Sequence, residues 1–130
     1  MKATDLRVTN MVMFRNFIIN PILFIGYDAV QLITPEGQTI TATLLDINPV
    51  SLTEEWLLRC GFKKVIEHFS VEDIHYENKN CWVYLLEDCF EIEVNCSDKR
   101  FNLWRQYKKE LHILQNLYKE IFQEELTIKF

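Results

Sequence analysis

The sequence predicts an α+β fold: a small N-terminal antiparallel β-meander or barrel, a short connecting helix, then an antiparallel sheet packed by one long C-terminal helix. The first fifty residues hold short apolar runs separated by turns, residues 49–62 carry helix start and stop signals, and residues 107–126 have a helical apolar stripe. At 130 residues we expect a single domain, with residues 1–50 forming the barrel-like part and residues 51–130 forming the remainder.

The N-terminal fifty residues alternate apolar runs with turns. The runs are MVMF (11–14), PILFIGY (21–27), AVQLIT (29–34) and QTITATLLDI (38–47). Pro35 and Gly37 in TPEG suit a β-turn. Five or so short strands with tight turns and no helix predict a small barrel of the Src-homology type, with an open meander as the alternative.

The segment PVSLTEEWLLRCGF, residues 49–62, predicts a helix of about two turns. Thr53 is a good N-cap, and Gly61 supplies the left-handed residue with which many helices end. Because so short a helix is unstable by itself, its apolar residues 56–58 must dock on something. We therefore expect a structural connector.

The following segments predict the second sheet. Residues 63–77 contain one or two strands, CWVYLL (81–86) suits a central strand buried on both faces, and FNLWR (101–105) can return as another strand. FEIEVN (90–95) alternates, with Phe90, Ile92 and Val94 directed inward.

The strongest periodic signal lies in residues 107–126. Tyr107, Leu111, Leu114, Tyr118 and Ile121 follow one another at spacings of 4, 3, 4 and 3. This stripe predicts a long helix that packs across one face of the second sheet.

Composition and charge exclude several classes of protein. The net charge of −5 is distributed as −1 over residues 1–50, −7 over 51–98 and +3 over 99–130, which is too acidic for a general nucleic-acid coat. No apolar run approaches the roughly 18 residues that a membrane span needs, and the N-terminus lacks a secretory signal. We expect a soluble cytoplasmic protein with no membrane partner and with its four cysteines as reduced, buried thiols.

Catalytic and cofactor motifs are missing from the sequence. It has no Gly-rich phosphate loop, GxSxG or HExxH, and its cysteines form no CxxC pair. His68 and His75 near Glu67, Glu72 and Asp73 form a conceivable metal cluster, but solvated sheet edges explain the same residues. We expect no metal and no cofactor.

The stretch from Lys99 to Lys119 has the best claim to a binding site, because it interleaves basic and aromatic side chains. Lys108, His112, Gln115 and Lys119 are expected to share a polar helix face opposite the Leu stripe. The alternative is an ordinary solvated helix face. The candidate binding residues are Arg100, Trp104, Arg105, Lys108, Lys109, His112, Gln115 and Lys119.

Three segments, LRVTN (6–10), PVSLTEEWLLRCGF (49–62) and LHILQNLYKEIFQEEL (111–126), resemble an uncharacterised family of short proteins encoded by gut Bacteroidales and their phages and prophages. The family tends to have Gly at the position of Thr9 and Thr-Gly at the position of Phe122–Gln123, and the second difference predicts a longer last helix here. The resemblance implies a phage or mobile-element origin and a small cytosolic product, and it implies no known activity.

Three classes of function follow. The first is a non-catalytic accessory protein that binds a host or phage protein, including one that inhibits a host defence system. The second is a binder of a nucleotide signal or nucleic acid through residues 99–119, whose affinity would fall steeply with salt. The third is a small enzyme. The sequence leaves the oligomeric state open.

Overall fold

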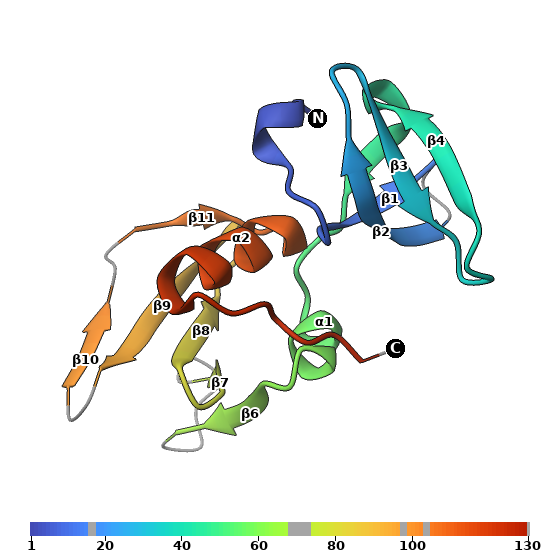
Figure 1. Cartoon of the computed structure of the whole chain (residues 1–130). Coiled ribbons are helices and arrows are strands. Elements are labelled where there is room, and N and C mark those ends of the chain that lie inside the picture. The colour runs from blue at the N-terminus through green and yellow to red at the C-terminus, as the bar shows by residue number, and fades with distance from the viewer. Residues whose placement is uncertain (16–17, 68–73, 97–98, 103–104, 130) are drawn as a thin grey trace. The chain divides into compact units, whose positions relative to one another are not determined.

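The fold is α+β, with two antiparallel sheets and two α-helices, the second of them C-terminal, as the sequence predicts (Figure 1). The computed structural model describes residues 1–15, 18–67, 74–96, 99–102 and 105–129. The chain divides into two compact units: unit 1 comprises Met1–Ser51 and Glu110–Leu117, and unit 2 comprises Leu52–Lys109 and Tyr118–Phe130.

Unit 1 is built on an open five-stranded sheet of order β4-β3-β2-β1-β5. Its elements are η1 (Ala3–Asp5), β1 (Met11–Phe14), β2 (Ile18–Ile25), β3 (Ala29–Ile33), β4 (Thr39–Thr43), η2 (Leu44–Asp46) and β5 (Ile47–Pro49). The sheet does not close into a barrel, so the open meander is the predicted arrangement that the structure has. The 3₁₀ turn η2 leads β5 to β1, and β4 and β5 remain the two edge strands of the sheet.

Strand β2 serves both halves of this sheet. Its residues 18–21 pair with β1, and residues 22–25 pair with β3, with a register shift between Ile22 and Phe24. Such an irregularity bends a strand. The core that the bent sheet encloses consists of Leu6, Val12, Ile22, Val30, Leu32, Ala42 and Ile47.

Polar side chains of the C-terminal helix complete unit 1. The Gln115 side chain accepts the N–H of Met11 through Oε1 at 2.9 Å and donates through Nε2 to the Thr9 carbonyl at 3.2 Å. Beside it, Asn116 Oδ1 accepts from Asn10 Nδ2 at 2.8 Å. These bonds satisfy backbone groups that precede and begin β1.

Unit 2 contains the second sheet, of order β10-β9-β8-β7-β6, with β11 pairing onto β9 as well. Its elements are α1 (Glu54–Arg59), β6 (Lys63–Ile66), β7 (Ile74–Glu77), β8 (Cys81–Leu85), β9 (Cys89–Cys96), β10 (Lys99–Asn102) and β11 (Tyr107–Lys108), and it shares α2 (Leu111–Phe122) with unit 1. Cys81, Val83, Phe90 and Ile92 form the fully buried side of the central strands.

Helix α1 has the predicted ends. Thr53 Oγ1 accepts the N–H of Trp56 at 3.4 Å, and Gly61 has a φ of +87°. The N–H of Phe62 then bonds to the carbonyl of Leu57 at 3.1 Å, as in a Schellman motif. The helix is therefore defined at both ends by local sequence.

Two expectations about buried side chains are wrong. In α1, Trp56 and Leu57 are buried, but Leu58 is 49% exposed and does not dock with them. In the central strand β8, Trp82 and Tyr84 are only half-buried, so just one face of the strand is fully covered.

Helix α2 is shorter than the periodicity suggests at both ends. Tyr107 and Lys108 form β11, and Glu110 bridges Ser51, so the helix begins only at Leu111. It ends at Phe122 because Gln123 has a φ of +58°, which terminates a helix as a glycine would. The predicted helical segment of residues 107–126 is therefore helical only over Leu111–Phe122.

Candidate functional site

The basic members of the predicted binding stretch lie on several elements. Arg100 belongs to β10, where only its backbone is described, and Trp104 lies outside the described residues. Arg105 is exposed, with its guanidinium carbon 5.8 Å from the centroid of the Tyr107 ring. Lys108 is an exposed residue of β11, and therefore it is not on the helix at all.

The remaining predicted residues have structural partners or are buried. Lys109 is half-buried, and its carbonyl accepts the N–H of Leu52. His112 and Gln115 are buried, and Gln115 uses its amide on the backbone of unit 1. Lys119 Nζ donates to the Gln123 carbonyl at 3.5 Å, at the end of α2. The polar helix face expected to contain Lys108, His112, Gln115 and Lys119 is therefore not formed.

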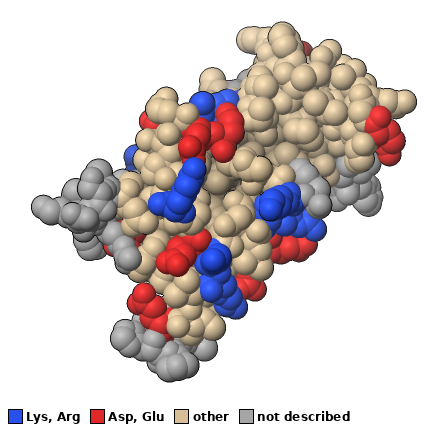
Figure 2. All heavy atoms as spheres, turned by 60° about the horizontal axis from the view of Figure 1, so that its bottom comes forward, with Lys and Arg blue, Asp and Glu red and all other residues tan. Residues whose placement is uncertain are grey.

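Charges of both signs are mixed on the surface. On the face shown in Figure 2, Lys and Arg side chains lie beside Asp and Glu side chains and do not gather into one basic area. In the described part of unit 2, Arg59 forms an ion pair with Glu55 at 2.9 Å, Lys64 with Glu54 at 2.7 Å and Lys79 with Glu124 at 3.5 Å. A phosphate backbone is usually bound by cations that gather on one face.

Unit 2 contains a cavity of about 480 Å³, within the range of small-ligand sites. It lies between the end of α1, the β7–β8 turn, the end of α2 and the C-terminal segment, and its lining residues are Cys60, Gly61, Lys63, Glu77, Asn78, Lys79, Tyr118, Glu124, Glu125, Leu126 and Thr127. The lining carries two lysines and three glutamates, and therefore it has no strong preference for either sign of charge.

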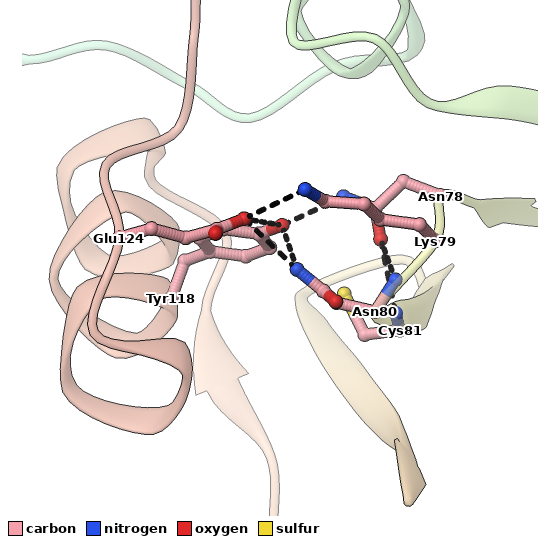
Figure 3. Close-up of polar contacts among 6 residues, drawn as sticks. All are labelled: Asn78, Lys79, Asn80, Cys81, Tyr118 and Glu124. Atoms are coloured by element: carbon pink, nitrogen blue, oxygen red, sulfur yellow. Dashed lines mark hydrogen bonds and ion pairs between the residues drawn. The ribbon is translucent and has the colours of Figure 1, made fainter. Parts of the chain in front are cut away.

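A hydrogen-bond network around Tyr118 forms one wall of this cavity (Figure 3). The Tyr118 hydroxyl accepts from Asn80 Nδ2 at 2.7 Å and Asn78 Nδ2 at 3.2 Å, and it lies 3.4 Å from Glu124 Oε1. Asn78 Oδ1 in turn accepts the N–H of Asn80 and of Cys81, both at 2.9 Å. These polar groups bind one another, so this wall fastens the chain after α2 to the β7–β8 turn.

The thiol at the cavity is unsuited to nucleophilic chemistry. Burial raises the pKa of Cys60 to about 12, and it has the same effect on Cys81. At neutral pH both side chains are therefore thiols, whereas the thiolate is the form that attacks. Cys60, Cys81 and Cys89 are all free cysteines.

Among the residues that the structure describes, the most exposed large apolar side chains belong to unit 1. Tyr27, in the β2–β3 turn, is 97% exposed, and Leu45, in η2, is 93% exposed. Their backbones are adjacent, because the N–H of Leu44 donates to the carbonyl of Asp28 at 3.1 Å. We call Tyr27 and Leu45 the apolar tip.

Phe24 adds to the apolar surface near the tip. It lies three residues before Tyr27 and is 60% exposed, because the register shift in β2 turns it away from the core. Sequence analysis did not find these residues, since it assigned each of them to a strand. The signal was present: Tyr27 follows a glycine in a turn, and Leu45 sits in a run whose alternation has ended.

The described residues contain neither a metal-binding cluster nor a membrane-spanning helix. There, no group of three or more His, Cys, Asp and Glu side chains is placed to hold a metal ion, and His68 lies outside them. Nor does that part of the chain contain a helix with the length and apolar character that crossing a membrane requires. Comparison with protein-family models, curated proteins and solved structures gave no match.

Proposed function

We propose that this chain is a non-catalytic accessory protein that binds another protein through the apolar tip of unit 1. The observation that carries the proposal is the almost complete exposure of Tyr27 and Leu45 on adjacent backbone. Single exposed apolar residues are ordinary, but a pair of large ones at one place is typical of an interface. Tyrosine in particular is enriched among residues that dominate binding energy.

The surroundings of the tip indicate what the partner offers. Asp28 follows Tyr27 and is exposed, and Asp46 follows Leu45 and is half-buried. Interfaces commonly place an apolar centre inside a polar rim. A partner with an apolar pocket bordered by hydrogen-bond donors or cations would match the two side chains and the two carboxylates.

The resemblance to proteins of gut Bacteroidales and their phages adds an origin to the proposal. It supports a phage or mobile-element product that acts in the bacterial cytoplasm. The partner would then be a host or phage protein, and inhibition of a host defence system is one outcome of such binding. We keep binding of a nucleotide or nucleic acid as the alternative.

The test is affinity capture from host lysate with three forms of the tagged chain: the natural sequence, Tyr27→Ser/Leu45→Ser, and Ile66→Ser as the matched control. Ile66 is 53% exposed but belongs to unit 2. We expect a stoichiometric protein that the natural chain and the control retain and the tip variant loses, with affinity reduced on the order of tenfold or more.

Two results would count against the proposal. A partner retained equally by all three forms would place the interface elsewhere. A co-purifying nucleotide or nucleic acid that is lost with Arg105→Glu/Lys108→Glu, and with rising salt, would establish the alternative.

A further inference from the structure

Strand β4 is an edge of the five-stranded sheet of unit 1 (Figure 1). Among the strands that the structure describes, β4 pairs with β3 alone. Backbone hydrogen bonds mark both ends of this pairing. At one end the N–H of Leu44 donates to the carbonyl of Asp28 at 3.1 Å, and at the other the N–H of Thr34 donates to the carbonyl of Gln38 at 2.7 Å.

These two bonds show which backbone groups of β4 point toward β3. Both lie on the register of the β3–β4 pairing, in which Leu32 is opposite Ile40. Hydrogen-bonded residues alternate along an antiparallel pair, so the even-numbered residues of β4 direct their N–H and C=O groups toward β3. Thr39, Thr41 and Thr43 therefore direct theirs toward the open edge, and their side chains are exposed.

The edge at β4 lacks the residues that usually protect an open strand. The other described edge strands have them: β5 ends in Pro49, β6 begins with two lysines, β10 begins with Lys99 and Arg100, and β11 contains Lys108. Residues 38–45, which include β4, contain neither a charge nor a proline. Because charges and proline prevent edge-to-edge pairing in natural sheets, their absence here favours the addition of a strand at β4.

We propose that β4 pairs with β4 of a second copy of this chain, antiparallel, about a twofold axis at Thr41. The outward-directed residues are spaced evenly on both sides of Thr41, so each Thr41 lies opposite the other, and Thr39 lies opposite Thr43 of the second copy. Each of the three pairs exchanges two bonds, which gives about six hydrogen bonds. A twofold contact of this kind uses the same edge of both copies and closes at the dimer.

The side chains of β4 are also complementary to themselves in this register. On the exposed face threonine lies opposite threonine, which is a favourable cross-strand pair. On the other face Ile40 lies opposite Ala42 of the second copy, and both residues belong to the apolar core of unit 1 or pack against it. No like charges meet, because residues 38–45 are uncharged. This match in backbone groups and side chains is why a second copy is the partner that the edge fits.

The dimer goes beyond the proposed function and does not depend on it. The paired residues Thr39, Thr41 and Thr43 are distinct from Tyr27 and Leu45 of the apolar tip. The edge and the tip can therefore be impaired separately by substitution.

The test is sedimentation of the full chain in the ultracentrifuge at concentrations from about 10 μM to 1 mM. We expect a monomer–dimer equilibrium with a dissociation constant on the order of 100 μM, because a single strand pair buries less surface than a stable interface does. Dimer mass should be the upper limit, since the contact closes at two copies.

Thr41→Lys locates the contact, because it brings two cations opposite each other at the axis. The matched control is Gln31→Lys, which adds the same charge at an exposed position of β3, directly opposite Thr41 and one strand further from the axis. We expect Thr41→Lys to weaken dimerisation about fivefold or more and the control less than about twofold, since like charges are unfavourable when opposite and screened when distant. Mixing Thr41→Lys with Thr41→Glu should restore a mixed dimer.

Amide hydrogen exchange of the natural chain tests the register without any substitution. Between about 10 μM and 1 mM, the N–H groups of Thr39, Thr41 and Thr43 should come to exchange about threefold more slowly, because they gain partners in the dimer. Those of Ile40 and Ala42 should change little, since they already point toward β3.

Any of three results would overturn the proposal. The first is a monomer at every concentration up to about 1 mM, and the second is equal weakening by Thr41→Lys and Gln31→Lys. The third is association that Tyr27→Ser/Leu45→Ser abolishes and Thr41→Lys leaves intact, which would place the contact at the tip. A monomeric chain would leave the proposed function untouched, because capture from host lysate tests other residues and a different partner.

Discussion

Thr9 adopts a backbone conformation that its side chain disfavours, with a φ of 77°. Its N–H donates to the Ile22 carbonyl at 2.8 Å, and its carbonyl accepts from Gln115 Nε2 at 3.2 Å, so bonds on both sides hold it there. A β-branched residue at positive φ is strained. Gln123 has the same left-handed character, with a φ of 58°. Glycine, which adopts positive φ without strain, would suit both positions.

Replacing Thr9 by glycine is expected to stabilise unit 1. Glycine reaches positive φ without a steric cost of about 1–2 kcal/mol, although it also increases the entropy of the unfolded chain. We expect a net gain of about 0.5–1 kcal/mol in the free energy of unfolding, measured by urea denaturation. Thr9→Ala is the control, since it removes the same side-chain contacts but keeps a Cβ. Equal effects of both substitutions, or a loss with glycine, would show that the backbone stores no strain.

At the scale of elements, Glu54 fastens helix α1 to the second sheet. Glu54 Oε1 lies 2.7 Å from Lys64 Nζ in β6, and the hydroxyl of Tyr76 in β7 donates to it at 3.0 Å. The hydrogen bond from Lys64, and then that from Tyr76, lowers the pKa of Glu54 below its usual 4.5. The same contact, after burial, raises the pKa of Tyr76 to about 12.

This contact predicts a specific pH dependence. Because the pKa of Glu54 is lower in the folded state, the folded chain binds fewer protons than the unfolded chain. The contribution of Glu54 to stability is therefore present above about pH 4.5 and is lost as the pH falls through the folded pKa. Glu54→Gln should therefore lower the urea midpoint at pH 7, and the difference from the natural chain should shrink at pH 3. Glu55→Gln, in the same helical turn but paired with Arg59 of the same helix, is the control. A constant difference at both pH values would contradict the assignment.

Local sequence is enough to predict some of these elements and not others. The ends of α1 depend on residues within one turn of it, so Thr53 and Gly61 reveal them directly. The start of α2 depends on Glu110 bridging Ser51, a partner distant in sequence. Strand β5 likewise pairs with β1, which is distant in sequence, and not with β4, the strand that precedes it.

The candidate binding residues show the same limit. Gln115 has the spacing of a solvated helix face, yet it is buried because the backbone of residues 9–11 comes to it. Tyr27 looks like a strand residue until the turn around Gly26 exposes it. Spacing along a chain reports which side of a helix or strand a residue occupies, whereas exposure depends on which other segment covers that side.

At the scale of the whole molecule, α2 divides its side chains between the two units. Gln115 bonds to the backbone of unit 1, and Tyr118, three residues later, bonds to the β7–β8 turn of unit 2. Beside Gln115, Asn116 accepts a hydrogen bond from Asn10 Nδ2 of unit 1.

This division predicts that substitutions on one helix affect the two units differently. Gln115→Ala leaves the Met11 N–H and the Thr9 carbonyl without their partner, which costs about 1–3 kcal/mol when such groups are buried. By hydrogen exchange we expect the amides of β1 and β2 to exchange about tenfold faster or more, with β8 and β9 little changed. Tyr118→Phe should have the converse effect, centred on the β7–β8 turn, and Glu120→Ala, on the exposed side of α2, should change neither. Equal acceleration of exchange in both sheets by Gln115→Ala would contradict this prediction, because the two units would then have to unfold as one. The shared helix α2 would in that case transmit the loss of one side chain to the whole chain.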